Sequence, residues 1–144
     1  HIFISISKYN ELDTSFIINK LKSEKKNIIV PKISNNELVH IAINDKTEFS
    51  INEYDIEEPN NGNSFIIENL DLIFIPLLAY DLEGHRVGYG MGYYDKFLKL
   101  TNKSSLKIGL SFFDPINKIQ DIDDNDVKLD YCITPTQVHK FDHI

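Results

Sequence analysis

Short apolar runs alternate with polar segments along the chain, and their lengths predict strands. In the first third, residues 2–6, 27–31 and 38–43 are rich in isoleucine and valine. Runs of this length and composition favour buried or half-buried strands over helices. The two asparagines at 35–36 separate the last two runs and predict a tight turn there.

A helix is expected between the first two of these strands. Phe16, Ile17 and Leu21 recur at the spacing of one helical face. Asp13 or Thr14 precedes them as a candidate N-terminal cap. The sequence therefore predicts a short helix that buries these three apolar side chains.

The alternation continues after a polar stretch, residues 44–64, which is expected to be surface loop with one strand. Strands that alternate with helices predict a largely parallel sheet covered by helices on both faces. A chain of 144 residues with 42% hydrophobic content is expected to form one α/β domain, residues 1–144. The elements expected in its second half are strands at 70–79, 107–112 and 131–134 and a helix at 93–100.

Glycine is concentrated in one short segment. Four of the six glycines lie between Gly84 and Gly92, directly after an apolar run and directly before the helix expected at 93–100. Glycine there indicates a loop with unusual backbone angles or close contact with a ligand. A strand, a glycine-rich loop and a helix in this order can direct free N–H groups toward a phosphate.

Composition and charge narrow the classes of partner. The chain has 22 acidic and 15 basic residues, a formal net charge of −7, which disfavours nucleic acid and anionic membrane surfaces as partners. No apolar run reaches the roughly 18 residues of a membrane span, and no leader peptide is evident. The single cysteine, Cys132, excludes a disulfide within the chain and is expected to be a buried thiol. A cytoplasmic monomer that binds a small molecule is the expected outcome.

The loop does not match the familiar nucleotide-binding motifs. It lacks the Gly-Lys-Ser/Thr ending of a Walker A sequence, and Gly88, Gly90 and Gly92 are spaced as G-x-G-x-G rather than G-x-G-x-x-G. It does contain Arg86, which can bind two phosphate oxygens at once. Asp95 follows in the first helical turn, where it could complement the helix dipole or help to bind Mg²⁺.

Other polar residues give weaker signals. Asp126 could supply a second carboxylate, although the acidic run around it is also typical of a solvated loop. His139 and His143 are four positions apart, a spacing that can bind a metal on a helix. Their place near the C-terminus instead favours a frayed tail.

These residues together resemble the signature of the 5-formyltetrahydrofolate cyclo-ligase family, also called 5,10-methenyltetrahydrofolate synthetase. The resemblance is carried by Asp71–Pro76, Ala79–Asp81 and Gly84–Phe97. It extends over about residues 2–134, which is far more specific than one glycine loop. Further matching segments are Tyr9–Thr14, Val30–Lys32, Ile56–Pro59, Asp126–Asp130 and Ile133–Thr134.

The resemblance implies a fold, a reaction and a set of site residues. The fold is a three-layer α/β/α arrangement with a mostly parallel sheet, similar to the sugar-phosphate isomerase and CoA-transferase group. The reaction is the ATP- and Mg²⁺-dependent conversion of 5-formyltetrahydrofolate to 5,10-methenyltetrahydrofolate, with release of ADP and phosphate. The implied catalytic residues are Arg86 and Tyr94; the ATP-binding residues are Arg86, Val87, Gly88, Tyr89, Gly90, Met91, Gly92, Tyr93 and Tyr94; the substrate-binding residues are Glu11, Tyr89, Gly90, Met91, Gly92 and Tyr93; and the metal ligands are Asp95 and Asp126.

Two departures from the family pattern keep a second hypothesis open. Many relatives carry basic residues at the positions of Tyr89 and Met91, and a basic N-terminal helix precedes the segment that begins here at His1. The chain is therefore expected to be N-terminally truncated relative to the family. A non-catalytic relative that binds folate or nucleotide is the alternative function. A third hypothesis, an unrelated α/β nucleotide-binding module, is disfavoured by the matches outside the glycine loop.

Overall fold

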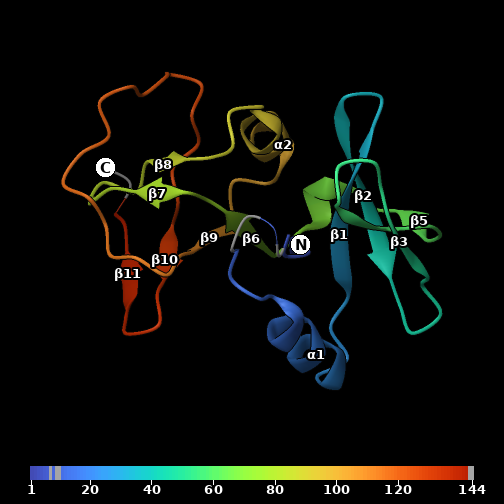
Figure 1. The fold of residues 1–144 in the computed structure, drawn as a ribbon. Coiled ribbons are helices and arrows are strands. Elements are labelled where there is room, and N and C mark those ends of the chain that lie inside the picture. The colour runs from blue at the N-terminus through green and yellow to red at the C-terminus, as the bar shows by residue number, and fades with distance from the viewer. Residues whose placement is uncertain (7, 9–10, 143–144) are drawn as a thin grey trace. The chain divides into compact units, whose positions relative to one another are not determined.

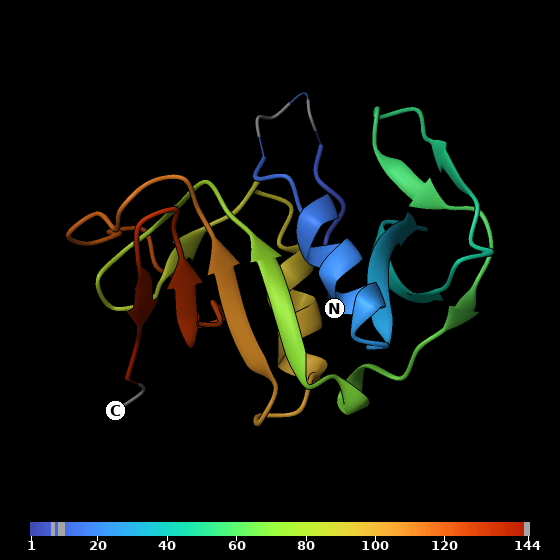
Figure 2. The ribbon, with the colours of Figure 1, turned by 90° about the horizontal axis from the view of Figure 1, so that it is seen from below.

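The computed structural model describes residues 1–6, 8 and 11–142. The chain divides into two compact units, His1–Ile67 and Glu68–Ile144, which are described separately (Figures 1 and 2). Within the described residues, no helix combines the length and the hydropathy needed to cross a membrane.

The first unit is built on an antiparallel hairpin. Strands β1 (Ile28–Ser34) and β2 (Glu37–Ile43) pair along their whole length, from Ile28 opposite Ile43 to Ser34 opposite Glu37. Asn35 and Asn36 form the connecting turn with φ angles of 50° and 60°. Two-residue hairpin turns of this kind require positive φ at both positions, which asparagine tolerates better than most residues. The turn predicted from the sequence is therefore confirmed.

The polar segment 44–64 contains more strand than its sequence predicts. It forms three short strands, β3 (Phe49–Ile51), β4 (Glu57–Pro59) and β5 (Asn63–Ser64). β5 extends the hairpin sheet beside β2, and β3 pairs with β4. The buried Glu58 accepts a hydrogen bond of 2.8 Å from the Ile33 N–H, which attaches β4 to β1. The expectation of a loop with one strand was wrong because backbone pairing and the Glu58 bond, rather than an apolar run, stabilise these strands.

The segment that opens the chain is not a regular strand, although its apolar pattern predicts one. Its backbone makes one ladder-like contact, from the Ile2 N–H to the Ile29 carbonyl at 2.9 Å. Side chains of residues 11–14 satisfy other groups: Thr14 Oγ1 donates to the Phe3 carbonyl at 2.8 Å, and the Ile6 N–H donates to Glu11 Oε2 at 2.7 Å. Side-chain contacts thus replace the partner strand at these backbone positions.

Helix α1 (Ser15–Ser23) follows, as predicted, but its cap differs in detail. Thr14 is the N-cap residue without a side-chain capping bond, and Asp13 instead accepts a hydrogen bond of 2.9 Å from the Ser15 N–H. This bond lowers the pKa of Asp13. Ile17 is half-buried, whereas Phe16 is 76% exposed, so the predicted apolar face is only partly correct.

The second unit contains a four-stranded sheet with the order β11-β10-β9-β6. Strands β6 (Leu72–Pro76), β9 (Leu106–Leu110) and β10 (Tyr131–Ile133) are parallel neighbours (Figure 2). Strand β11 (Val138–Lys140) pairs antiparallel with β10. Helix α2 (Tyr93–Leu100) belongs to the crossover between β6 and β9, lies over one face of the sheet and buries Phe97 and Leu98 (Figures 1 and 2).

The core of this sheet is tightly packed around β9. A Cβ atom added to Gly109 would lie 2.7 Å from Leu77 Cδ2 and 2.8 Å from Leu129 Cδ1, so a larger residue would force these two leucine side chains to shift. Cys132 is the buried thiol that the sequence predicts, and burial raises its pKa to about 12. The thiol is therefore protonated and poorly nucleophilic at neutral pH.

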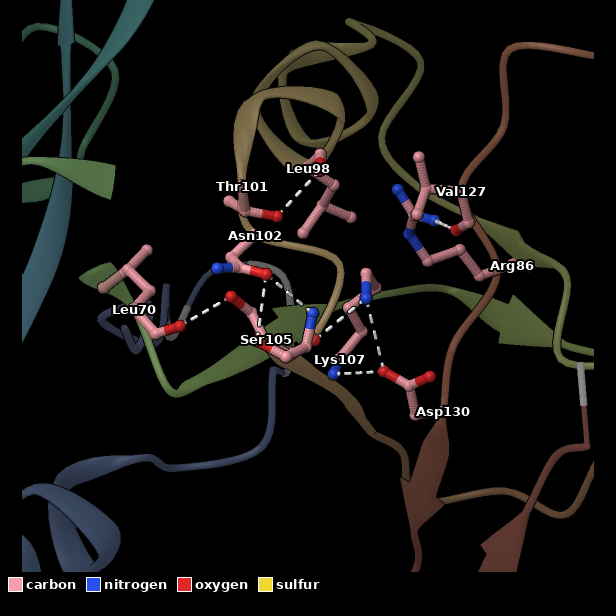
Figure 3. A network of polar contacts seen from close by, with 10 residues as sticks. Leu70, Arg86, Leu98, Thr101, Asn102, Ser105, Lys107, Val127 and Asp130 are labelled. Atoms are coloured by element: carbon pink, nitrogen blue, oxygen red, sulfur yellow. Dashed lines mark hydrogen bonds and ion pairs between the residues drawn. The ribbon is translucent and has the colours of Figure 1, made fainter. Parts of the chain in front are cut away.

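Polar contacts fix the starts of the three parallel strands (Figure 3). Ser105 Oγ donates to the Leu70 carbonyl at 2.5 Å, immediately before β6 and β9 begin. The Lys107 N–H donates to Asp130 Oδ2 at 2.7 Å, which joins β9 to the residue that precedes β10. These buried or half-buried hydrogen bonds fix the starts of the three strands relative to one another.

The α/β class is confirmed, while finer parts of the expectation are not. Among the described residues, parallel strand pairs occur in the second unit, whereas the strand pairs of the first unit are antiparallel. The three-layer arrangement and the single domain over residues 1–144 stay predictions.

We expect the stability of the protein to fall between pH 6.5 and pH 4 because of His40. Burial lowers the pKa of this β2 histidine to about 4. The unfolded chain binds a proton near pH 6.5 and the folded chain does not, so the folded state loses about 2 to 3 kcal/mol over this interval. Urea unfolding at pH 7.5 and pH 4.5 should show this extra loss in the wild type relative to His40→Gln. Equal losses in the two proteins would contradict the prediction.

Candidate functional site

The glycine loop (residues 84–92) runs from the turn of a short hairpin, through its second strand, to helix α2. Strands β7 (Ala79–Tyr80) and β8 (Arg86–Val87) pair antiparallel, and the loop then leads to Gly92, the N-cap residue of α2. The strand, loop and helix predicted from the sequence are therefore present, with this hairpin inserted after β6.

The backbone of residues 88–92 is exposed and free of crowding. Gly90 and Gly92 have φ angles of 87° and 65°, which only glycine adopts without strain. A Cβ atom added at Gly88, Gly90 or Gly92 would meet no atom within 4 Å. At these three glycines the loop thus presents its main chain to whatever binds there.

Arg86 is buried at the start of this exposed segment. Its side chain is 4% exposed, and Nη2 donates to Asp95 Oδ1 at 2.6 Å. Nη1 donates to the carbonyl oxygen of Val127 (Figure 3). A guanidinium cannot give up its charge, so its burial requires an anionic partner. Asp95 is that partner.

The same carboxylate oxygen also binds the chain that approaches β10. Asp95 Oδ1 accepts a second hydrogen bond, of 3.1 Å, from the Val127 N–H. Arg86 and Asp95 therefore bind both backbone polar groups of Val127. β8 and the first turn of α2 thus meet a segment 32 residues beyond Asp95, at Val127, which directly follows the acidic run of residues 121–126. The ion pair joins Arg86 to Asp95, the two residues that flank positions 87–94. It therefore holds together the two ends of the exposed part of the glycine loop.

Val127 is the contact that sequence reasoning missed. Its bonds use backbone atoms, which leave no signature in the side-chain pattern. The one available signal was the resemblance over Asp126–Asp130, which placed this segment near the loop without naming a contact.

The two predicted metal ligands differ in their present bonds. Asp95 Oδ1 is occupied by Arg86 and Val127, as described. Asp126 is half-buried and its Oδ2 accepts a hydrogen bond of 3.0 Å from the Asp123 N–H. Asp126 precedes Val127 directly, so the chain brings the two carboxyl-bearing segments together.

Oxygen donors of this kind suit Mg²⁺, which commonly uses one or two protein carboxylates together with phosphate oxygens. Among the described residues, no group of three or more His, Cys, Asp and Glu side chains could hold a metal ion by itself. A shared site with a phosphate ligand is the arrangement that fits this donor set.

The predicted aromatic and apolar residues of the loop fall into two groups. Tyr89 and Met91 are 42% and 64% exposed on the loop itself. Tyr93 and Tyr94 are half-buried at the start of α2, where the ring of Tyr94 meets that of Phe97 edge-on, with centroids 6.0 Å apart. The catalytic role predicted for Tyr94 stays a prediction.

Glu11 belongs to the first unit and is described by its own contacts. It is half-buried, and its Oε2 accepts the Ile6 N–H. Its predicted role in binding the pterin stays a prediction. Tyr9 and Asn10, from the same matching segment, lie outside the described residues.

Of the two C-terminal histidines, His139 is described, and it lies in a strand rather than on a helix. His139 lies in β11 opposite Cys132, and its ring meets that of Tyr80 with centroids 5.7 Å apart. The expectation of a frayed tail was wrong for this residue because pairing with β10 orders the segment. His143 lies outside the described residues.

Comparison with known proteins gives one consistent family. Residues 1–135 match the model of the 5-formyltetrahydrofolate cyclo-ligase family. A 5-formyltetrahydrofolate cyclo-ligase of Mycoplasma genitalium is 48% identical over 52 residues, which cover 36% of this chain and 32% of that protein. A probable 5-formyltetrahydrofolate cyclo-ligase of Schizosaccharomyces pombe is 30% identical over an alignment that covers 89% of this chain and 71% of that protein.

A solved structure agrees with these sequence relationships. The NMR structure of Aquifex aeolicus 5,10-methenyltetrahydrofolate synthetase has a TM-score of 0.82 and 28% identity, and the match covers 99% of this chain and 71% of that one. The matched region thus spans about a third of the Mycoplasma relative and 71% of the other two proteins.

We expect the tightly packed start of the glycine loop to tolerate substitution much less than its exposed part. A Cβ at Gly84, where φ is 85°, would lie 2.9 Å from Phe141 Cγ and 3.0 Å from the Leu129 carbonyl oxygen. Gly84→Ala should therefore lower the free energy of unfolding by about 1 to 3 kcal/mol in urea titrations. Gly88→Ala is the matched control, with open space and no positive φ, and should change it by less than about 0.5 kcal/mol. Equal effects of the two substitutions would be incompatible with this packing.

Proposed function

Because this chain belongs to the 5-formyltetrahydrofolate cyclo-ligase family, we propose that it catalyses the ATP-dependent ring closure of 5-formyltetrahydrofolate to 5,10-methenyltetrahydrofolate. The single observation that carries the proposal is the exposed glycine loop, closed by the buried Arg86–Asp95 ion pair, in a chain that matches the family over residues 1–135. The further expectations of a monomeric, cytoplasmic protein stay predictions.

The proposed chemistry begins with activation of a poor electrophile. The formyl group on N5 is an amide, and its oxygen is a poor leaving group. Transfer of the γ-phosphoryl group of ATP to this oxygen releases ADP and makes phosphate the leaving group. N10 then attacks the formyl carbon and forms the second C–N bond. Loss of the N10 proton and cleavage of the C–O bond release phosphate and give the methenyl product.

This sequence of steps needs no nucleophile from the protein. Phosphoryl transfer depends mainly on positioning and on neutralisation of charge. We assign the positioning of the ATP phosphates to the exposed main chain of residues 88–92, where N–H groups can approach phosphate oxygens closely. Arg86 contributes fixed positive charge beside the loop, and two of its five N–H donors form the bonds to Asp95 and Val127.

The donor set around the loop also fits the divalent ion that accompanies ATP. Asp126 and Asp95 would hold Mg²⁺ through carboxylate oxygens, and the bound ion would supply neutralisation of phosphate charge. In this proposal Asp95 has two roles, since it would bind the ion and its Oδ1 already accepts hydrogen bonds from Arg86 and Val127. Asp126 is therefore the residue whose substitution reports on the ion with less disturbance of the buried pair.

A second candidate function has one specific observation in its favour. Tyr89 and Met91 are exposed and uncharged in the loop, at positions where a basic side chain would attract phosphate. A protein that binds folate or nucleotide without turnover would tolerate this loss of charge. The two functions differ in one result, the appearance of product.

The direct test mixes the protein with 5-formyltetrahydrofolate, ATP and Mg²⁺ and follows the absorbance of methenyltetrahydrofolate together with ADP. Product and ADP should appear in equal amounts, and omission of any one component should abolish both. A folded protein that binds either ligand, as judged by calorimetry, and forms no product would favour the second candidate.

Asp126→Asn should weaken the dependence on Mg²⁺ without unfolding the protein. The concentration of Mg²⁺ that gives half-maximal turnover should rise by about tenfold or more, because an amide oxygen is a poorer Mg²⁺ ligand than a carboxylate. The exposed neighbour Asp124→Asn is the matched control and should leave this concentration unchanged. Near-UV circular dichroism checks the fold of both variants. An unchanged Mg²⁺ requirement in Asp126→Asn would remove this residue from the metal site.

A further inference from the structure

A buried carboxylate outside the residues assigned so far organises the approach to Arg86. Asp81 follows β7 and is 0% exposed. Its Oδ1 accepts the N–H groups of Glu83 and His85, both at 2.9 Å. These two bonds fix the tight turn that leads directly into Arg86.

The second carboxylate oxygen binds a different part of the chain. Asp81 Oδ2 accepts the Ile119 N–H at 3.1 Å and lies 3.1 Å from His85 Nδ1. Backbone bonds reinforce this contact, since the Ile116 N–H donates to the Tyr80 carbonyl at 2.9 Å. The segment that begins at Ile119 leads to Val127, which binds both Arg86 and Asp95.

One carboxylate thus anchors two segments that converge on the same guanidinium. Burial alone would raise the pKa of Asp81, but the N–H groups of Ile119, His85 and Glu83 and the His85 ring lower it below its ordinary value. The group is therefore an anion that accepts four hydrogen bonds, and an uncharged amide in its place could not accept them all.

We propose that Asp81 is a positioning residue for the nucleotide site: through the turn at 81–85 and the segment from Ile119 to Val127, it sets the orientation of Arg86 and of the glycine loop. This role rests on the proposed function of the loop. Asp81 itself does not touch the substrates in this assignment; it acts through Arg86.

The test combines Asp81→Asn with Arg86→Lys in a double-mutant cycle on the affinity for MgATP, measured by calorimetry. Each single substitution should weaken MgATP binding by about tenfold, whereas Asp81→Asn should add less than about twofold in the Arg86→Lys background. Asp121→Asn makes the same chemical change at an exposed position of the same segment and should leave the affinity unchanged. Independent tenfold effects in both backgrounds would overturn the proposal, because they would mean that Asp81 acts by a route other than Arg86.

Amide hydrogen exchange separates failure of this inference from failure of the proposed function, since it needs no ligand. In Asp81→Asn, the exchange of the Val127 amide, which donates to Asp95 Oδ1, should become at least tenfold faster, while β6 and β9 stay protected. Uniform exchange changes, or none at Val127, would overturn the positioning role even if MgATP does not bind to the wild type. Should Asp81→Asn not fold, His85→Ala removes one of the four donors, and unchanged exchange at Val127 in that variant would count equally against the proposal.

Discussion

Burial of the Arg86 guanidinium is the constraint on which the rest of the candidate site depends. A charge that cannot be neutralised by proton loss must be matched by an anion and by hydrogen-bond acceptors. Asp95 supplies the anion and Val127 supplies a carbonyl. Because these residues come from α2 and from the chain that precedes β10, matching one charge determines where three segments meet. The first turn of α2 and the residue after the acidic run 121–126 are thereby fixed beside β8.

This arrangement explains how a glycine loop can be exposed to solvent and still have an ordered conformation. At Gly88, Gly90 and Gly92 there is open space where a Cβ atom would lie, so the three glycines remove the crowding that would otherwise restrict the approach of a ligand. The order of the loop must then come from its two ends, which the ion pair joins. The proposed ligase chemistry needs such a surface, because phosphoryl transfer relies on placed N–H donors and charge rather than on a protein nucleophile. Basic side chains are absent at Tyr89 and Met91, so in this proposal more of that charge would come from Arg86 and from a bound metal ion.

The sequence predicted those elements that local chemistry dictates. The asparagine pair at 35–36, the buried thiol of Cys132 and the helix after the glycine loop all follow from short-range preferences. The strands within residues 44–64 could not be predicted, because a distant partner, such as the Ile33 N–H that binds Glu58, stabilises them. The contact at Val127 could not be predicted for a similar reason, since Val127 binds its distant partners Arg86 and Asp95 through backbone atoms. The resemblance to the family placed Arg86 and Asp95 in one sequence motif. The hydrogen bond between them became evident only in the folded structure.

The central claim is that Arg86 and Asp95 act as one buried unit that closes the glycine loop. A double-mutant cycle with Arg86→Met and Asp95→Asn, measured by urea unfolding at neutral pH, tests it most directly. Each single variant leaves a buried partner unmatched, so the double variant should be more stable than the sum of the single losses predicts, with a coupling free energy of about 2 kcal/mol or more. Losses that add to within about 0.5 kcal/mol would contradict the account, because they would mean that the two side chains do not stabilise the fold through each other.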